Sequence, residues 1–228
     1  MAADTLVTID AASTALLIID MQRDFCDEGG YAAQAGLDTA RLAGAIGNIR
    51  LLLDAARKAG LLVVHTREGH LPDLSDCPPA KLARSIAAGA PIGQHGPMGR
   101  LLVRGEVGHD IIDQLRPQAG EAVIDKPGYG AFHRTDLDML LQRHAIRTLV
   151  LCGVTTEVCV HSTLREAVDR GFACMTVGDA CAASNPALQQ AALDMIRVEG
   201  GIFGAVAGTQ GVLLALHGAA RSIPKQAS

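Results

Sequence analysis

The sequence predicts an α/β fold: a three-layer, doubly wound sheet of about six mainly parallel strands, with helices on both faces. Short apolar runs alternate along the chain with stretches whose apolar residues recur at helical spacing. Several apolar runs are nearly continuous, which is typical of strands buried on both faces of a parallel sheet. Hydrophobic residues make up 49% of the 228 residues and charged residues only 19%, so the chain can bury a large core.

Each apolar run is a predicted strand. The runs are 15–20 (ALLIID), 61–66 (LLVVHT), 121–126 (EAVIDK), 148–153 (TLVLCG), 172–179 (FACMTVGD) and 201–206 (GIFGAV). The predicted helices cover 37–60, 108–116, 135–144, 157–170 and 186–199, and a short helix follows the last strand. The first helix has Leu42, Ile46, Ile49 and Leu53 on one face and ends at the basic residues and glycine of "RKAG".

One long stretch, 67–100, shows neither the apolar runs of the predicted strands nor helical spacing of apolar residues. It is rich in proline and glycine. A loop of this length in a compact domain usually has a function, such as a lid or a contact between subunits. No repeat, low-complexity tract or linker interrupts the strand–helix pattern. We therefore expect residues 1–228 to form a single domain with this one insertion.

The composition excludes several classes of partner. The net charge is −4, aromatic residues make up 3%, and there is no Trp, so neither a basic surface nor stacking platforms for nucleic acid are expected. No apolar run reaches the roughly 18–20 residues that span a bilayer, and the first residues do not resemble a signal peptide. The six cysteines are too sparse for a disulfide scaffold. We expect a cytoplasmic protein without nucleic-acid or membrane partners.

Polar residues stand where three predicted strands end. Asp20 closes the first strand, Lys126 closes the third, and Cys159 lies a few residues beyond the fourth, at the start of a helix. Because ligands of open α/β sheets bind at the carboxyl ends of the strands, these side chains are candidates for one site. A buried, inert thiol is the ordinary alternative for Cys159. However, a helix start capped by Thr155 or Thr156 favours the thiolate and lowers the thiol pKa.

The three residues form a chemically coherent set. Asp20 can take the thiol proton, and the ammonium of Lys126 can stabilise both the carboxylate and the thiolate. The spacing of His65 and His70 matches no common zinc motif, and neither a dinucleotide-binding glycine pattern nor a serine-hydrolase motif is present. We therefore expect no metal and no organic cofactor.

The motifs resemble those of the isochorismatase-like cysteine hydrolases. The matching segments are "LLIIDMQRDF", "DKPGYGAF" and "CGVTTEVCVHSTLREAVDRGF", in the order of that family. The resemblance implies that Cys159 is the nucleophile, Asp20 the general base and Lys126 the third member of the triad. It also implies a cis peptide bond between Val154 and Thr155, with the N–H groups of Thr155 and Cys159 forming an oxyanion hole.

The resemblance also suggests a substrate class. The thiol points to the amidase members, and segments such as "DFCDEGGY" and "GPMGRLLVRGE" resemble those of biuret hydrolases. We expect ammonia release from a small urea oligomer, triuret or biuret, with Phe25, Thr156, Arg67 and Glu199 at the substrate. Glu199 stands where biuret hydrolases have Gln, and its carboxylate can accept hydrogen bonds from an N–H-rich substrate end.

Other functions remain open. A ureidoacrylate or N-carbamoyl amino acid amidohydrolase would need a cation for the substrate carboxylate, such as Arg67 or Arg104. Nicotinamidases carry an Asp-x-His zinc motif, which is absent after "LLVVHTRE". A non-catalytic binding module would be expected to lack a member of the triad. A dimer or tetramer of this chain is also expected, with 67–100 as a candidate contact.

Overall fold

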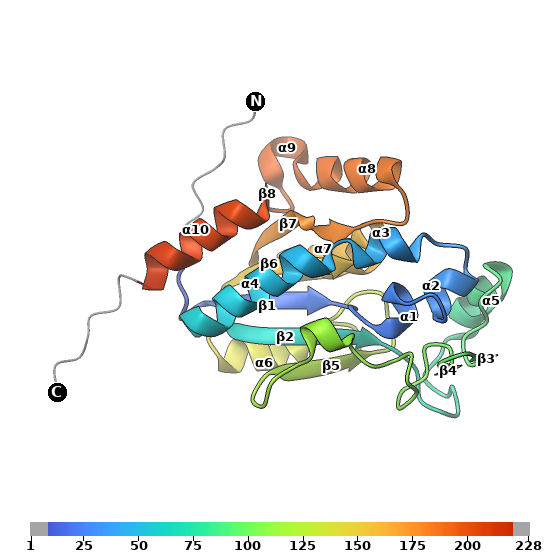
Figure 1. The fold of residues 1–228 in the computed structure, drawn as a ribbon. Coiled ribbons are helices and arrows are strands. Elements are labelled where there is room, and N and C mark those ends of the chain that lie inside the picture. The colour runs from blue at the N-terminus through green and yellow to red at the C-terminus, as the bar shows by residue number, and fades with distance from the viewer. Residues whose placement is uncertain (1–8, 221–228) are drawn as a thin grey trace.

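The computed structural model describes residues 9–220, in which six parallel strands form a central sheet between layers of helices (Figure 1). The strand order is β5-β2-β1-β6-β7-β8. The strands are β1 (Thr14–Ile19), β2 (Leu62–Glu68), β5 (Ala122–Lys126), β6 (Thr148–Val154), β7 (Ala173–Ala182) and β8 (Ala205–Ala207). The predicted fold class is confirmed, and each of the six predicted strands is present.

Helices cover both faces of the sheet. Helices α4 (Ile46–Ala59) and α10 (Thr209–Ala220) pack against each other on one face, and α6 (Leu137–Arg143) and α7 (His161–Asp169) lie on the other (Figure 1). Helix α8 (Pro186–Ile196) connects β7 to β8 and contacts the segment that precedes α7. All strand pairs in the sheet are parallel, so the helices serve as the crossover connections.

Two predicted helices differ from the structure. The predicted helix at 37–60 is two helices, α3 (Thr39–Ala43) and α4, which meet at Gly44. The predicted helix at 108–116 is replaced by a 3-10 turn, η1 (Asp113–Leu115). Ile111 instead forms an antiparallel bridge with Gln22, and Ile112 donates its N–H to Met21. Tertiary pairing of this segment with the end of β1 therefore overrides its helical spacing.

The stretch at 67–100 is partly regular. It contains the last residues of β2, helix α5 (Pro79–Ala87) and the short hairpin strands β3 (His95–Gly96) and β4 (Gly99–Arg100). Together with α1 (Arg23–Cys26) and α2 (Tyr31–Gln34), α5 lies beyond the carboxyl ends of the strands (Figure 1). The segment that the sequence marks as an insertion therefore lies at the edge where ligands of such sheets bind.

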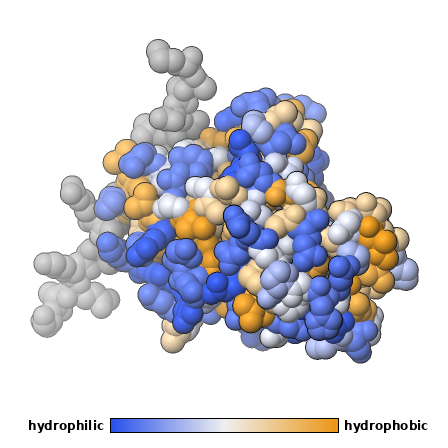
Figure 2. Space-filling view, turned by 45° about the vertical axis from the view of Figure 1, so that its right-hand side comes forward, coloured by the Kyte–Doolittle hydropathy of each residue, from blue (hydrophilic) through white to orange (hydrophobic). Residues whose placement is uncertain are grey.

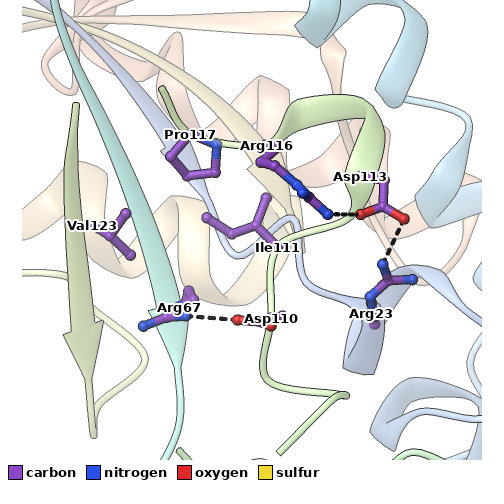
Figure 3. Close-up of a pocket in the computed structure, with 8 residues that line it drawn as sticks. All are labelled: Arg23, Arg67, Asp110, Ile111, Asp113, Arg116, Pro117 and Val123. Atoms are coloured by element: carbon purple, nitrogen blue, oxygen red, sulfur yellow. Dashed lines mark hydrogen bonds and ion pairs between the residues drawn. The ribbon is translucent and has the colours of Figure 1, made fainter. Parts of the chain in front are cut away.

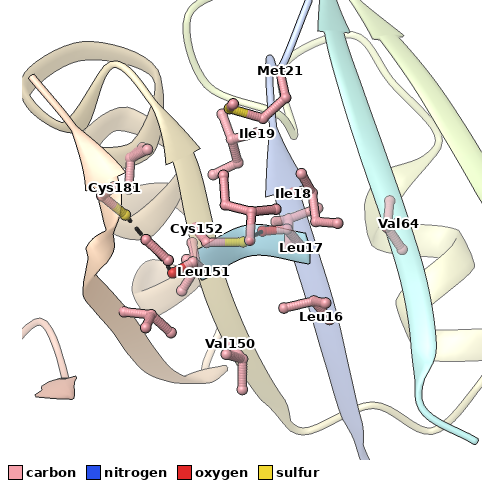
Figure 4. Packing of buried hydrophobic residues seen from close by; sticks show 14 of the residues in the cluster. Leu16, Leu17, Ile18, Ile19, Met21, Val64, Val150, Leu151, Cys152 and Cys181 are labelled. Atoms are coloured by element: carbon pink, nitrogen blue, oxygen red, sulfur yellow. Dashed lines mark hydrogen bonds between the residues drawn. The ribbon is translucent and has the colours of Figure 1, made fainter. Parts of the chain in front are cut away.

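Buried residues of the neighbouring strands β1 and β6 pack together in the core (Figure 4). All six residues of β1 are buried, and Cys152 on β6 packs there with its thiol 3.8 Å from the carbonyl oxygen of Leu17. Cys174 is also buried, at the start of β7. Both cysteines are core residues, as their positions in predicted strands indicate.

The face shown in Figure 2 is largely hydrophilic, with apolar residues in small separate patches. Between residues 9 and 220, none of the helices has the length and apolarity needed to cross a bilayer. Exposed apolar side chains also lie on α8 and on the turn after it. They are Leu188, Met195, Val198 and Ile202. The dimer or tetramer expected from the sequence remains a prediction.

Candidate active site

Asp20 follows the last residue of β1 and has a left-handed backbone conformation, with φ of 52°. Its side chain is completely buried, and its Oδ1 accepts a hydrogen bond of 2.6 Å from the hydroxyl of Thr66 on the neighbouring strand β2. Burial disfavours the charged form and raises the pKa of Asp20, against the effect of Lys126. The strand end thus provides a carboxylate with a raised affinity for a proton.

Lys126 is the last residue of β5 and is also completely buried. Its Nζ lies 2.7 Å from Asp20 Oδ2 and donates hydrogen bonds to the carbonyl oxygens of Gly128 and Tyr129, at 3.0 and 2.9 Å. Burial is the largest single influence and opposes the charge, but the negative groups around Lys126, Asp20 first among them, together outweigh it and raise the pKa of Lys126. The ammonium is therefore a permanent charge of the site.

Cys159 lies in a π-helical turn, η2 (Thr156–Val160), that leads directly into α7. Its Sγ, a carboxylate oxygen of Asp20 and one of Glu68 all lie within 4.8 Å of one another. Burial is the largest influence on the thiol and raises its pKa well above the ordinary value, although Lys126 acts in the opposite direction. The pKa lowering expected from the helix start is therefore not found, and the resting thiol is protonated.

Two charged residues that the sequence analysis did not select complete the cluster. Glu68, the last residue of β2, accepts a hydrogen bond from the Cys159 thiol at 3.3 Å, and Lys81 of α5 lies 2.6 Å from its other oxygen. Glu68 and Lys81 are only 3% and 5% exposed. The signal for Glu68 is its place at a strand end, and this signal is lost because the predicted strand stops at Thr66.

The cluster contains ligand types for a metal, since Asp20, Glu68 and Cys159 offer two carboxylates and a thiol. However, each carboxylate is already paired with a lysine, Asp20 with Lys126 at 2.7 Å and Glu68 with Lys81 at 2.6 Å. A divalent cation at this position would face both ammonium groups. The donor set therefore fits a metal poorly, and we derive no step through one.

The backbone before Cys159 has the arrangement that the resemblance implies. The Val154–Thr155 peptide bond is cis, and Thr155 directly precedes the turn that carries Cys159. Thr156 is fully buried, and its hydroxyl donates a 2.7 Å hydrogen bond to Oε1 of Gln189 on α8. The Thr156 side chain therefore fixes the turn to α8, and a role for its hydroxyl at the substrate remains a prediction.

Phe25 lies on α1. It is buried, and its ring packs edge-on against that of Tyr31, with centroids 6.0 Å apart. Burial, followed by the charge of Glu68, raises the pKa of the Tyr31 hydroxyl to about 12. The two rings therefore pack together near the start of the chain's first helices, and a role for Phe25 at the substrate remains a prediction.

Arg67 does not belong to the cluster around Cys159. Because side chains alternate along a strand, Arg67 lies on the face of β2 opposite to Thr66 and Glu68. Its guanidinium pairs with Asp125 at 2.7 Å and with Asp110 at 3.0 Å, and it lines a separate surface pocket (Figure 3). The expected role of Arg67 in binding substrate is therefore not supported within one chain. Arg104 is likewise held by Asp76, at 3.4 Å.

Glu199 is also distant from the cluster. It lies in the turn α9 (Val198–Gly201), at the far end of α8 from Thr156 and its partner Gln189 (Figure 1). With a rise of about 1.5 Å per residue, the stretch from Gln189 to Ile196 extends about 10 Å along α8, and Glu199 follows three residues later. The Glu199 side chain is exposed. The sequence prediction that Glu199 contacts the substrate is therefore not supported within one chain.

Residues 14–210 match the sequence profile of the isochorismatase domain. The chain belongs to the isochorismatase family. A ureidoacrylate amidohydrolase, RutB, of Serratia proteamaculans is 37% identical over 184 residues, which cover 79% of this chain and 74% of the relative. A protein of the same name from Methylorubrum extorquens is 36% identical and covers 82% of this chain and 77% of the relative.

Solved structures of this family agree with the fold. A cysteine hydrolase from Pseudomonas syringae has a TM-score of 0.79 and 29% identity, with 95% of this chain and 99% of that chain covered. An N-carbamoylsarcosine amidase from Thermoplasma acidophilum has a TM-score of 0.65 and 28% identity, with 86% and 96% covered. The prediction that the chain is an amide-cleaving hydrolase of the isochorismatase family is confirmed at this level. The named relatives are not biuret or triuret hydrolases.

Proposed function

We propose that this member of the isochorismatase family is a cysteine amidohydrolase that cleaves the ureido group of a small carboxylate, such as ureidoacrylate or an N-carbamoyl amino acid. The observation that carries the proposal is the buried cluster of Cys159, Asp20 and Lys126. The thiol and the Asp20 carboxylate lie within 4.8 Å, and Lys126 is 2.7 Å from that carboxylate. A nucleophile, a base and a fixed cation therefore meet at one strand edge.

Formation of the nucleophile follows from the two raised pKa values. Cys159 and Asp20 both hold protons more strongly than usual because both are buried, so the proton can move between them at a moderate free-energy cost. Lys126 stabilises whichever of the two groups is negative. In this mechanism Asp20 takes the thiol proton as the sulfur attacks the carbonyl carbon of the substrate.

The reaction then proceeds through a covalent S-acyl intermediate, which for a ureide is a thiocarbamate, a thioester whose carbonyl carbon carries nitrogen. The N–H groups of Thr155 and Cys159 stabilise the oxyanion, the C–N bond to the terminal nitrogen breaks, and Asp20 gives its proton to the departing ammonia. Water, deprotonated by Asp20, attacks the thioester and releases Cys159. The product is a carbamate, which can lose carbon dioxide to leave an amine.

The substrate class rests on the relatives and on the position of Glu199. Relatives at 36–37% identity are named for ureidoacrylate, and a neighbour in structure is named for N-carbamoylsarcosine. The sequence argument for triuret or biuret depended on Glu199, which lies at the far end of α8. The names of the relatives therefore support ureido compounds that carry a carboxylate, and a group other than Arg67 or Arg104 must bind that carboxylate, since both arginines are paired with aspartates.

A substrate panel tests this proposal. Ammonia release is measured with ureidoacrylate, N-carbamoyl-β-alanine, N-carbamoylsarcosine, biuret, triuret and nicotinamide. We expect the highest kcat/KM for one of the ureido carboxylates. A higher kcat/KM for biuret or triuret would contradict the proposal and favour the urea oligomers, and no turnover of any compound would favour a non-catalytic module.

The dependence of activity on pH tests the role of Asp20. A general base acts only when ionised, so kcat/KM should fall as the pH drops through the Asp20 pKa, which burial raises above its ordinary value of 3.8. The hydroxyl of Thr66 lowers this pKa through its hydrogen bond. We expect Thr66→Val to move the acidic limb of the profile upward by about one pH unit.

A matched control separates this effect from the loss of a buried hydroxyl. Thr176 is also completely buried, and its hydroxyl has no hydrogen-bond partner among residues 9–220. Thr176→Val should leave the acidic limb unchanged. An unshifted limb in Thr66→Val would mean that Asp20 does not control it.

A further inference from the structure

Glu68 is a buried carboxylate that the triad mechanism does not use. Three donors surround it: Lys81 Nζ lies 2.6 Å from Oε1, while Lys126 Nζ and Cys159 Sγ lie 3.6 and 3.3 Å from Oε2. Oε1 therefore faces Lys81, and Oε2 faces the reacting sulfur. The carboxylate is fixed between a lysine of α5 and the nucleophile.

The side chain is held in its ionised form. Burial opposes ionisation, but the charges of Lys81 and Lys126 outweigh it and lower the pKa of Glu68 below the ordinary value. An ionised carboxylate only accepts hydrogen bonds, and its two oxygens offer about four acceptor sites. Near the thiol, Glu68 can therefore recognise only hydrogen-bond donors.

The reaction removes one of its donors. In the resting state the S–H of Cys159 points to Oε2 of Glu68. When Asp20 takes that proton, the thiolate can no longer donate, and two negative groups about 3.3 Å apart face each other. A donor from the bound substrate at this position would replace the lost hydrogen bond and reduce the repulsion.

We propose that Glu68 is a specificity-determining residue, which accepts a hydrogen bond from a substrate N–H and selects ureides over simple carboxamides. In a ureide, nitrogen atoms flank both sides of the carbonyl carbon that Cys159 attacks. Where the inner nitrogen carries hydrogen, as in N-carbamoyl-β-alanine, an N–H therefore lies within a few ångströms of the sulfur whichever nitrogen leaves. A carboxamide has carbon on one side and offers fewer donors. This inference rests on the proposed amidohydrolase function and adds to it the group that binds the ureido N–H.

Lys81 has a positioning role in this proposal. Its ammonium also donates to the carbonyl oxygen of Pro127 at 2.6 Å and lies 4.9 Å from the ring centre of Tyr129. Helix α5, in the stretch at 67–100, thus extends a buried cation to the carboxylate from the side away from the thiol. Lys81 keeps Oε1 occupied and leaves Oε2 for the substrate.

The test uses binding to a protein that cannot react. The affinities of N-carbamoyl-β-alanine and glutaramate are measured by calorimetry with the full-length Cys159→Ala variant. The two ligands differ only in that CH2 replaces the ureido N–H. We expect the ureide to bind about tenfold or more tightly, because glutaramate leaves the buried carboxylate without its donor.

Glu68→Gln in the same background should reduce this ratio to below about threefold. Lys81 attracts the carbonyl oxygen of the new amide, so the NH2 group turns toward the substrate and faces its N–H. Glu199→Gln is the matched control, since Glu199 is exposed and distant, and it should keep the ratio of the parent. If Glu68→Gln fails to fold, Glu68→Met/Lys81→Met removes both charges and should give the same loss of selectivity.

The outcomes separate this inference from the proposed function. Equal affinity for both ligands in Cys159→Ala, a ratio unaffected by the loss of Glu68, or binding of neither ligand would each overturn the role of Glu68, even if the wild-type enzyme hydrolyses ureides. Selective binding that depends on Glu68 would support it, even if the wild-type enzyme releases no ammonia and the proposed function fails. A loss of turnover alone, with the ratio retained, would mean that Glu68 acts on the thiol and not on the substrate.

Discussion

Cys159→Ala and Cys159→Ser are expected to lower kcat for ammonia release by about 10⁴-fold or more, because the nucleophile is lost while the rest of the site remains. The thiol is almost completely buried and contacts Glu68, so a small side chain fits the same space. Circular dichroism and the melting temperature should change little. Serine is a weaker nucleophile here because its hydroxyl has a higher pKa than a thiol.

Cys174→Ala is the matched control for this experiment. Cys174 is buried like Cys159 but lies at the start of β7, at the opposite end of the sheet from the cluster. Its replacement should leave kcat nearly unchanged. If Cys159→Ala kept most of the activity, catalysis through a thioester would be wrong.

Lys126→Met should be the most destabilising single change in the site. The substitution leaves the Asp20 carboxylate buried without its cation, which typically costs about 3–5 kcal/mol of the free energy of unfolding. Urea denaturation measures this change, and ammonia release should be lost at the same time. Lys58→Met, on the exposed surface of α4, is the control and should stay within about 0.5 kcal/mol of the parent.

The double variant Asp20→Asn/Lys126→Met separates charge from packing. If the unpaired carboxylate causes the loss, removing its charge should restore part of the stability without restoring activity. A double variant as unstable as Lys126→Met alone would instead indicate that Lys126 stabilises the fold through its hydrogen bonds to Gly128 and Tyr129.

The parts of the fold that the sequence predicts are those with a simple periodicity. The continuous apolar runs predict the central strands β1 and β6 because these strands are buried on both faces, whereas the edge strands β5 and β8 are only partly buried. The predicted helix at 108–116 is wrong because Ile111 pairs with Gln22, a long-range contact that no local pattern encodes. Helix α5 was missed although Pro79 at its start is a common beginning of a helix.

The sequence predicts those residues of the candidate site that lie both in a family motif and at or just beyond the end of a predicted strand. Asp20, Lys126 and Cys159 carry both signals, and the structure brings them together. Glu68 carries only the second signal. Lys81 carries neither, since its place beside Glu68 depends on how the stretch at 67–100 folds back over the strand ends.

Arg67 and Glu199 show where the prediction of site residues from sequence fails. Each was selected for its chemistry, but their positions depend on which face of β2 a residue occupies and on the direction of α8. Strand alternation can be read only when the boundary of the strand is known. The prediction ended β2 two residues early, so this information was lost.

The alternation of charged side chains along β2 also favours a single register between β2 and β5. Arg67 stands beside Asp125 of β5, and Glu68 stands beside Lys126, so opposite charges meet on both faces of these neighbouring strands. Sliding β2 by one residue in one direction would place Arg67 beside Lys126, and in the other direction Glu68 beside Asp125. Either shift puts like charges side by side on two neighbouring strands, one face of which is buried. The ion pairs between β2 and β5 thus also stabilise the observed register of the two strands relative to either one-residue shift.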